Sequence, residues 1–370
     1  MNNLNNRLFI DIHALQTLPP CNINRDDTGS PKTAQYGGAT RARVSSQCWK
    51  RAMRTYFKEH GAEENVGVRT LYLVKYIAKK IVSLDSSISD KNAFKLGEKV
   101  LSRAGVKTTD GKAKALFFIG EKQATALAQA AIAPAAIDGV DDKKSLQALK
   151  KSLQALLHKN LPIDIALFGR MLADDPSLNE DASAQVAHAI STHAIQHEFD
   201  YFTAIDDLSP KDNAGAGMLG TVEYNSSELY RYASIALHEF LSQLDDDKEA
   251  LAASVKLFVK AFVESMPTGK ANTFANQTLP HLLLITLRDD RPVNLVSAFE
   301  EPVKSTDGYA SQSTTKLAQE MAKTEKIVHK PLVSFYVSLT TCEHMQKLGE
   351  EKPSMQALLD DLATKITEIL

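Results

Sequence analysis

The chain has 370 residues and a formal net charge of −2 at pH 7, with 44% hydrophobic and 24% charged residues. This length can bury one large core or two ordinary ones, and the composition is typical of a globular protein in water. No apolar run reaches the roughly 18 residues of a membrane span, and residues 1–15 lack the order of a signal peptide, so we expect no membrane partner and a cytoplasmic location.

The three cysteines, Cys21, Cys48 and Cys342, lie far apart and form no C-x-x-C pair. Structural zinc sites and disulfide-rich domains usually show closely spaced or numerous cysteines. We therefore expect neither, which agrees with a reducing compartment.

The chain is predicted to begin with a strand, a long loop and a second strand. Residues 8–15 alternate apolar side chains, whereas Pro19 to Gly38 has no periodicity and is rich in Pro, Asn, Asp and Gly. Arg41 to Val44 follows Gly37-Gly38 and is expected to form the second strand. Long ordered loops such as the one at Pro19 to Gly38 are often functional.

A helix is predicted next, and the stretch that contains it carries the strongest functional signal. Trp49, Met53 and Tyr56 belong to a continuous apolar face. Thr40 to Lys58 holds six cations and no acid. Ser45 or Ser46 can cap the helix, and its first N–H groups favour an anion. This pattern favours phosphate binding, although a solvated basic helix remains the alternative.

The rest of the chain is predicted to be a helical block, a hairpin and a mixed C-terminal part. Residues 66–200 look helical, including a helix over Ala182 to His197, and 199–224 resembles an extended β-hairpin. Later elements are expected to be helices over Glu228 to Leu244 and Lys248 to Glu264, strands over His281 to Leu287 and Leu332 to Thr341, and a helix from Ser354.

Two motifs are weak when their context is considered. Gly215 to Gly220 matches G-x-G-x-x-G, but the sequel is a predicted strand and not a helix, so we expect no nucleotide cofactor. His193 and His197 are four apart on the predicted helix and could share a metal ion, but no third ligand is evident, so packing or surface histidines are favoured.

Adjacent carboxylates raise the possibility of metal-dependent chemistry. Asp26-Asp27 and Asp206-Asp207 are predicted to lie in loops, where a two-metal nuclease could use them. Loop aspartates more often cap turns. We expect no catalytic residue and no bound metal, and keep a metal-dependent ribonuclease that uses Asp26 or Asp27 as the alternative.

Several motifs occur together in an order that is more specific than any one of them. The chain resembles the Cas7 backbone subunits (CasC, Cse4) of type I-E Cascade, the CRISPR surveillance complex. The resemblance extends from about residue 8 to about residue 310. The motifs that carry it are Asn24-Arg25-Asp26-Asp27, Gly37-Gly38, RVSSQxxKRAxR (43–54), DIALFGRM (164–171), HAISTH (188–193), FDYFTAIDDL (199–208) and YRYA (230–233).

The resemblance implies an α+β fold shaped like a hand. A modified RRM/ferredoxin-like palm would comprise 1–60 and 225–370, a large helical insertion over 61–198 would form the fingers, and a long β-hairpin over 199–224 would form the thumb. Members of this family polymerise along a CRISPR RNA, hold it by its phosphates and present its bases to target DNA. The expected partners are CRISPR RNA, target DNA, other copies of the chain and other Cascade subunits.

The resemblance also assigns the site, and it implies a protein that is not an enzyme and needs no cofactor. Met171 and Thr203 would sit at a displaced base, and Lys143 and Lys144 would meet target DNA. A stand-alone single-strand binding module is a further alternative. The implied RNA contacts are Arg25, Lys32, Arg43, Ser45, Gln47, Lys50, Arg51 and Arg54.

Overall fold

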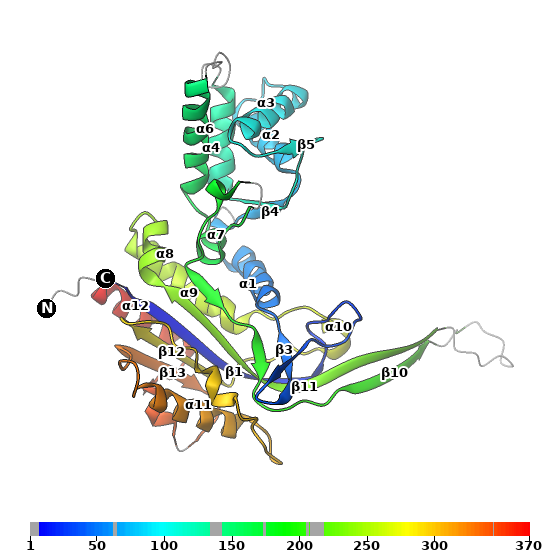
Figure 1. The fold of residues 1–370 in the computed structure, drawn as a ribbon, viewed down its shortest axis with the longest axis vertical. Helices are drawn as coiled ribbons and strands as arrows, with labels where there is room; N and C mark the ends of the chain where they lie inside the picture. The colour runs from blue at the N-terminus through cyan, green and yellow to red at the C-terminus, as the bar shows by residue number, and fades with distance from the viewer. Residues whose placement is uncertain are drawn as a thin grey trace. The chain divides into compact units, whose positions relative to one another are not determined.

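A computed structural model of the chain describes residues 7–61, 65–133, 143–172, 175–204, 207, 218–342 and 344–370. Its elements are labelled in Figure 1, and the mixture of a large sheet with many helices confirms the predicted α+β class. The chain divides into two compact units, and the division into palm, fingers and thumb stays a prediction. Unit 1 comprises Met1–Met53, Val186–Ala236 and Phe258–Leu370; unit 2 comprises Arg54–Gln185 and Leu237–Leu257.

Unit 1 is built on one mixed sheet with the strand order β14-β13-β12-β1-β11-β9-β3-β2. Every named pair along this order is antiparallel except β13 with β14. The central strands are buried on both faces; β12 is almost continuously apolar, whereas β1 also buries Asp11, His13 and Gln16. The strands are β1 (Phe9–Cys21), β2 (Thr33–Tyr36), β3 (Ala39–Val44), β9 (Ala189–Ser191), β11 (Met218–Ala236), β12 (Leu282–Arg288), β13 (Val333–Ser338) and β14 (Glu350–Glu351).

Helical segments cover this sheet. Leu317 of α11 (Ala310–Thr324) and Phe299 of η3 (Leu295–Phe299) share a core with Leu284 of β12. The closing helix begins where it was predicted, and Oγ of Ser354 caps it by accepting from N of Ala357 at 3.1 Å. The remaining helices of this part are α10 (Ala271–Phe274), η4 (Met345–Leu348) and α12 (Met355–Ile369); the unit boundary falls inside α1 (Ser46–His60) and α9 (Lys248–Glu264).

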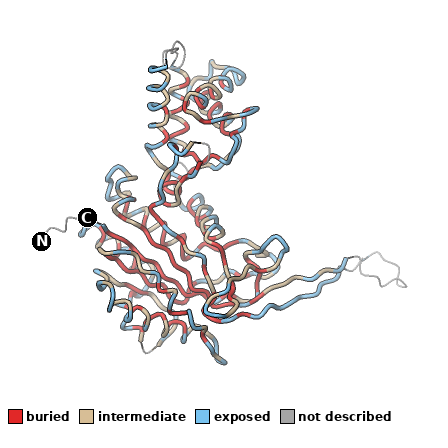
Figure 2. The backbone as a smooth tube through the Cα atoms, in the orientation of Figure 1, coloured by how far each residue is buried: buried red, intermediate tan, exposed pale blue. Residues whose placement is uncertain are grey.

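A two-stranded ribbon extends the sheet. β10 (Glu198–Ala204) pairs antiparallel with the first part of β11, from Glu198 opposite Tyr224 to Ala204 opposite Met218. The same β11 continues without interruption into the sheet, where Ile235 pairs with Ile10. Figure 2 shows the sheet end of β11 buried and β10 exposed along its length. The hairpin prediction is thus confirmed for its described strands, and its tip lies outside the described residues.

Unit 2 is a small helical body with its own core. Ile77, Val100 and Leu127 are fully buried there and come from three different helices. Two short antiparallel pairs are attached to it, β4 with β7, which are distant in sequence, and the hairpin of β5 with β6. Its elements are β4 (Val68–Thr70), α2 (Leu73–Leu84), α3 (Asp90–Arg103), β5 (Thr108–Thr109), β6 (Lys112–Ala113), β7 (Phe117–Ile119), α4 (Glu121–Ile132), α6 (Lys143–His158), α7 (Ile163–Phe168), η2 (Pro176–Leu178) and α8 (Leu237–Gln243).

Two predicted helices are wrong, and one predicted loop contains a strand. Ala182 to His197 forms β8 (Ala184–Val186), β9 and an irregular segment over 192–197. His193 and His197 therefore do not share a helix face. Glu228 to Leu244 is helical only in α8, because β11 runs on to Ala236. Pro19 to Gly38 includes the end of β1 and all of β2. Among the described helices, none is long and apolar enough to cross a membrane.

Candidate nucleic-acid interface

A tight hairpin leads into the cationic stretch. β2 and β3 pair from Thr33 opposite Ala42 to Tyr36 opposite Ala39, which leaves Gly37-Gly38 as a two-residue loop. Both glycines have positive φ, 56° and 71°, as a type I′ turn requires. A Cβ on Gly37 would lie 1.6 Å from the carbonyl oxygen of Glu300, so only glycine fits there. The turn thereby fixes β3 and the start of α1.

The beginning of α1 is held by three side chains. Oγ of Ser45 accepts from N of Cys48 at 3.3 Å, which confirms Ser45 as the cap. Oδ1 of Asn24 accepts from N of Ser45 at 2.8 Å and ties the preceding loop to the helix. Nδ1 of His188 accepts from N of Ser46 at 3.2 Å. The N–H groups of Ser45, Ser46 and Cys48 therefore already have acceptors. An anion at this place would be bound by side chains more than by free N–H groups of the helix terminus.

Cations gather around this capped start within unit 1. Nε of Arg43 donates to the carbonyl oxygen of Thr33 at 3.1 Å, and Nη1 of Arg43 lies 3.4 Å from Nδ1 of His188. Burial, then the charges of Arg43 and Lys32, lower the pKa of His188 and so favour its neutral ring, whose Nδ1 accepts from N of Ser46. Burial raises the pKa of the Cys48 thiol, and the nearby charges of Arg51 and Lys32 oppose that rise.

The remaining predicted contacts of unit 1 lie at the same place. Arg25 is exposed and follows Asn24, whose side chain binds Ser45. Gln47 is exposed in the first turn of α1, and Lys50 follows one turn later, half-buried, with its pKa lowered by burial. The structure thus brings together seven of the predicted RNA contacts. These are Arg25, Lys32, Arg43, Ser45, Gln47, Lys50 and Arg51.

Arg54 is placed differently, and its assignment as a simple phosphate contact needs correction. Its Nε donates to Oδ2 of Asp164 at 2.9 Å, and its guanidinium lies 4.3 Å from the ring centre of Phe118. The Asp164 carboxylate has no exposed surface, and Arg54 is 19% exposed. A buried carboxylate needs its cation, so the ion pair gives Arg54 a structural role inside unit 2.

Two other residues of the cationic stretch are structural. Arg41 is fully buried and donates to the carbonyl oxygens of Ser191, Phe299 and Glu300, so it does not share a free strand face with Arg43. Trp49 is 1% exposed, at the core position that the helical spacing predicts. These residues shape the site without facing a ligand.

The guanidinium of Arg231 explains how a tryptophan is accommodated there. It lies 3.6 Å from the ring centre of Trp49 and also donates to Oε1 of Gln16 at 2.6 Å. Complete burial lowers the pKa of Arg231 to about 9. A cation on an indole face is a favourable contact in a desolvated site.

The side chain of Asp26 caps a turn, which is the common role of loop aspartates and the alternative to metal binding by Asp26-Asp27. Its Oδ1 accepts from N and Oγ1 of Thr28 at 2.9 and 2.7 Å and from N of Ser30 at 3.0 Å. The hydrogen bonds, that from the Thr28 side chain first, lower the pKa of this exposed carboxyl. Within the described ranges, no group of three or more His, Cys, Asp or Glu side chains is placed to hold a metal ion.

Met171 is presented by a rigid scaffold in unit 2. It is 85% exposed, yet its neighbours are fixed: Arg170 and Glu180 exchange both backbone hydrogen bonds, and N of Leu172 donates to Oδ1 of Asn179 at 2.6 Å. The Arg170 guanidinium is buried and donates to the carbonyl oxygens of Leu178 and Leu157. An exposed methionine between anchored residues is a side chain positioned for contact.

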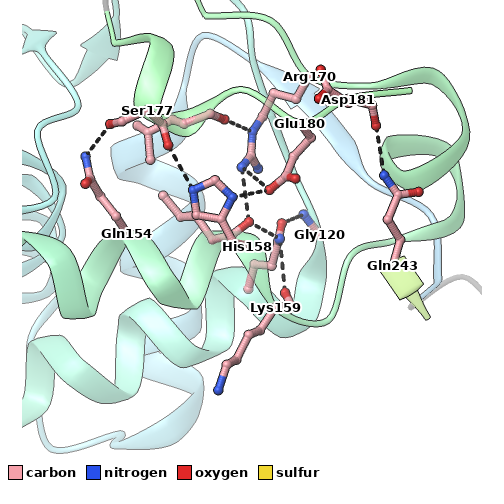
Figure 3. A network of polar contacts seen from close by, with 12 residues as sticks. Gly120, Gln154, His158, Lys159, Arg170, Ser177, Glu180, Asp181 and Gln243 are labelled. Carbon is pink, nitrogen blue, oxygen red and sulfur yellow. Dashed lines mark hydrogen bonds and ion pairs between the residues drawn. The ribbon is translucent and has the colours of Figure 1, made fainter. Parts of the chain in front are cut away.

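A charged cluster supports that scaffold (Figure 3). Nη2 of Arg170 lies 3.3 Å from Oε1 of Glu180, and Nδ1 of His158 lies 2.5 Å from the same oxygen. Nε2 of His158 faces the carbonyl oxygen of Ser177 at 2.9 Å. Both imidazole nitrogens therefore lie within hydrogen-bond distance of acceptor oxygens.

The other predicted residues are exposed on their elements. Thr203 lies in β10 opposite Leu219. Lys143 and Lys144 are the first residues of α6 and are exposed there. Sequence reasoning missed His188 as a site residue because it placed that histidine on a helix that does not exist.

Comparisons with known proteins agree with this fold. A sequence profile of the CT1975-like protein family matches residues 10–365. A solved structure titled "CRISPR RNA-guided surveillance complex, pre-nicking" contains a chain with 30% identity and a TM-score of 0.82, and the match covers 97% of this chain and 100% of that one. A chain of another, titled "CRISPR RNA-guided surveillance complex", has 28% identity and a TM-score of 0.64, over 96% and 99% of the two chains. No curated protein sequence matches.

Proposed function

The chain belongs to the CT1975-like protein family, and on that basis we propose that it is a Cas7-like subunit that binds CRISPR RNA in a surveillance complex. The proposal extends to the type I-E Cascade, which the motifs from Asn24 to Ala233 favour. The subunit would hold the guide by its phosphates and leave the bases free to pair with target DNA.

The observation that carries this proposal is the cationic cluster around the start of α1. Arg25, Lys32, Arg43 and Arg51 lie around the Ser45 cap, in a chain whose net charge is −2. Several cations around one helix start can bind the phosphates of a nucleic-acid backbone, and such contacts recognise no base. Binding is therefore expected to be salt-dependent and independent of guide sequence.

The ribbon of β10 and β11 supports the proposed contact with further copies of the chain. Phe199 and Tyr201 are 66% and 64% exposed, and Leu219 lies on the same face at 59%. A two-stranded ribbon has no core of its own, so such side chains need a partner surface to be buried. Thr203 on this ribbon and Met171 in unit 2 are the proposed contacts to a displaced base.

The proposal includes target DNA and the other Cascade subunits as partners, and it assigns the chain no catalytic step. Lys143 and Lys144 at the exposed start of α6 are the proposed DNA contacts. Turn formation by Asp26 agrees with a carboxylate that has a structural role. Incubation of the assembled complex with target RNA and Mg²⁺ is expected to leave the RNA intact, and cleavage that is lost in Asp27→Ala would favour the ribonuclease.

The test is a salt series of guide binding by the full chain. Arg25→Ala with Lys32→Ala is expected to weaken binding equally for guides of different spacer sequence. The slope of log K against log salt should fall by about 0.7 for each lost phosphate contact. Lys326→Ala with Lys330→Ala removes the same charge from an exposed segment after α11 and is the matched control. An unchanged slope in the Arg25 and Lys32 variant would contradict the proposed site.

A further inference from the structure

An exposed aromatic and cationic surface lies in unit 2, on different elements from the residues assigned above. Its side chains surround the turn between β5 and β6, beside α2 and α3 in Figure 1. Tyr72, just before α2, is 55% exposed, and Phe94 in α3 is 36% exposed. We call this surface the β5–β6 patch and define it by its exposed residues Leu71, Tyr72, Phe94 and Lys112.

Direct contacts show that the patch is continuous. Nζ of Lys112 lies 5.2 Å from the ring centre of Tyr72. Gly111, the preceding residue, packs against the Phe94 ring so closely that a Cβ there would be 2.3 Å from its Cζ atom. N of Ala113 donates to the carbonyl oxygen of Leu71 at 2.8 Å, which ties the hairpin to the residues before α2. The two rings therefore flank a single turn of the backbone.

The charges around the patch are mainly positive, with Asp110 in its turn and Asp90 and Glu98 bordering the α3 segment. The three segments that build it, 69–80, 91–95 and 105–116, contain nine cations and one acid, Asp110. Tyr72, Lys75 and Lys79 are spaced to share a helix face, and both lysines are exposed. Lys91 and Lys95 flank Phe94 and are exposed as well. Lys80 is paired with Glu121 and Arg69 lies 6.0 Å from the ring centre of Phe118, so neither is counted with the patch.

We propose that the β5–β6 patch is a binding site for single-stranded nucleic acid, with a base stacked on Tyr72 and the backbone phosphates held by Lys112 and its neighbours. Exposed rings among lysines are the usual combination for strands without sequence preference. A duplex hides the faces of its bases, so a stacking platform selects an unpaired strand. In the free protein Lys112 covers the Tyr72 ring, and its flexible stem allows the ammonium group to move to a phosphate while a base takes its place.

Localisation of the contact is the first part of the test. The full chain, loaded with guide RNA, is irradiated with an oligodeoxynucleotide that carries 5-bromouracil and cannot pair with the guide. Mass spectrometry of the peptides is expected to find cross-links at Tyr72 or Phe94. Cross-links confined to other segments would overturn the proposal. The experiment is repeated on the chain without RNA, so that a failure to load the guide and a failure of the patch are separate results.

Affinity measurements supply the second part. Binding of fluorescein-labelled oligo(dT) is expected to fall about tenfold in Tyr72→Leu, which keeps an apolar side chain but removes the stacking surface. Tyr72→Phe keeps the ring and should bind like the wild type. Lys112→Ala should lower the salt slope, whereas Lys112→Arg should not. Equal weakening in Tyr72→Phe and Tyr72→Leu would exclude stacking.

A competition experiment distinguishes nucleic acid from an acidic protein segment. Poly-glutamate is added to the complex of the full chain with oligo(dT) in amounts of equal charge. The proposal expects labelled oligo(dT) to remain bound when poly-glutamate is added. Unlabelled oligo(dT) should displace it. Displacement by poly-glutamate to the same extent would overturn it in favour of a protein partner. Unfolding midpoints of all variants are measured, and since Tyr72 is exposed they should equal that of the wild type.

Discussion

Nε of Arg54 lies 2.9 Å from Oδ2 of Asp164, and Oδ1 of the same carboxylate accepts from N of Gly67 at 2.8 Å. Burial raises the pKa of Asp164, while the hydrogen bond from Gly67 and the charge of Arg54 lower it. Arg54→Ala leaves this carboxylate unpaired and is expected to cost about 3–5 kcal/mol in the free energy of unfolding.

Denaturant unfolding of the full chain measures this cost. Arg54→Ala with Asp164→Asn should be less destabilised than Arg54→Ala alone, because the buried charge is then absent. Lys58→Ala, an exposed cation at the end of α1, is the control and should change stability by less than about 0.5 kcal/mol. If Arg54→Ala had wild-type stability but bound RNA more weakly, Arg54 would be an RNA contact and not a structural residue.

His188 is expected to position Arg43 and the start of α1 through one nitrogen. His188→Ala removes the acceptor for N of Ser46, and loss of a helix-capping contact costs about 0.5–2 kcal/mol. His188→Asn offers a carbonyl oxygen near the place of Nδ1 and should retain most of the stability and guide affinity. Thermal unfolding and filter binding measure both quantities, and equal losses in the two variants would contradict the role of Nδ1.

Stability should also depend on pH through His188. Its pKa in the folded protein is lowered from 6.5, so the folded state favours the neutral ring. The contribution is therefore complete above pH 6.5 and is lost as the pH falls below that value. The difference in free energy of unfolding between wild type and His188→Asn, measured over this range, should shrink toward acid pH.

Asp11 gives a pH dependence of the opposite direction. Burial raises its pKa from 3.8 to about 7, against the hydrogen bonds from Tyr232 and Val293. Because the folded state then holds the proton more tightly, stability should be greatest below pH 3.8 and fall as the pH rises toward 7. Between pH 3.8 and 7 the free energy of unfolding of the wild type should fall relative to that of Asp11→Asn. The same pH dependence in both proteins would contradict the raised pKa.

The exposed face of the β10–β11 ribbon should be needed for assembly and not for folding. Tyr201→Ser with Leu219→Ser alters two side chains that are 64% and 59% exposed, so the unfolding midpoint of the free chain should hardly change. Size exclusion with light scattering, in the presence of guide RNA, should show fewer copies for each RNA. Asp200→Ser, on the opposite face, is the matched control. Wild-type assembly in the double variant would exclude this face as the contact.

Local patterns predicted the elements whose burial has a clear period. Trp49, Met53 and Phe57 repeat at helical spacing and are all buried in α1, and the cap at Ser45 follows from the residues beside it. The hairpin over 199–224 was predictable because polar and turn-forming residues separate two β-rich runs.

The inner part of β11 was mispredicted as a helix, whereas β1 and β12, which are also buried on both faces, were predicted as strands. The inner part of β11, from Leu229 to Ile235, is buried at every position, so nothing in its sequence alternates and a helix was equally plausible. The pairing of Arg54 with Asp164, 110 positions away, depends on tertiary contacts that no local pattern reports. The same holds for His188, which reaches Ser46 across 142 positions.

The uninterrupted course of β11 has a mechanical consequence. Its hydrogen bonds to β1 lie across the strand direction, from Phe9 opposite Ala236 to Leu18 opposite Ser227, before a register shift that leads to Cys21 opposite Asn225. Tension along the distal half of the strand is therefore shared in shear by many of these bonds at once, with no loop between the halves to stretch first. The described part of the ribbon is anchored in the sheet, so a force on it is resisted by the pairing of β11 with β1 at the centre of unit 1.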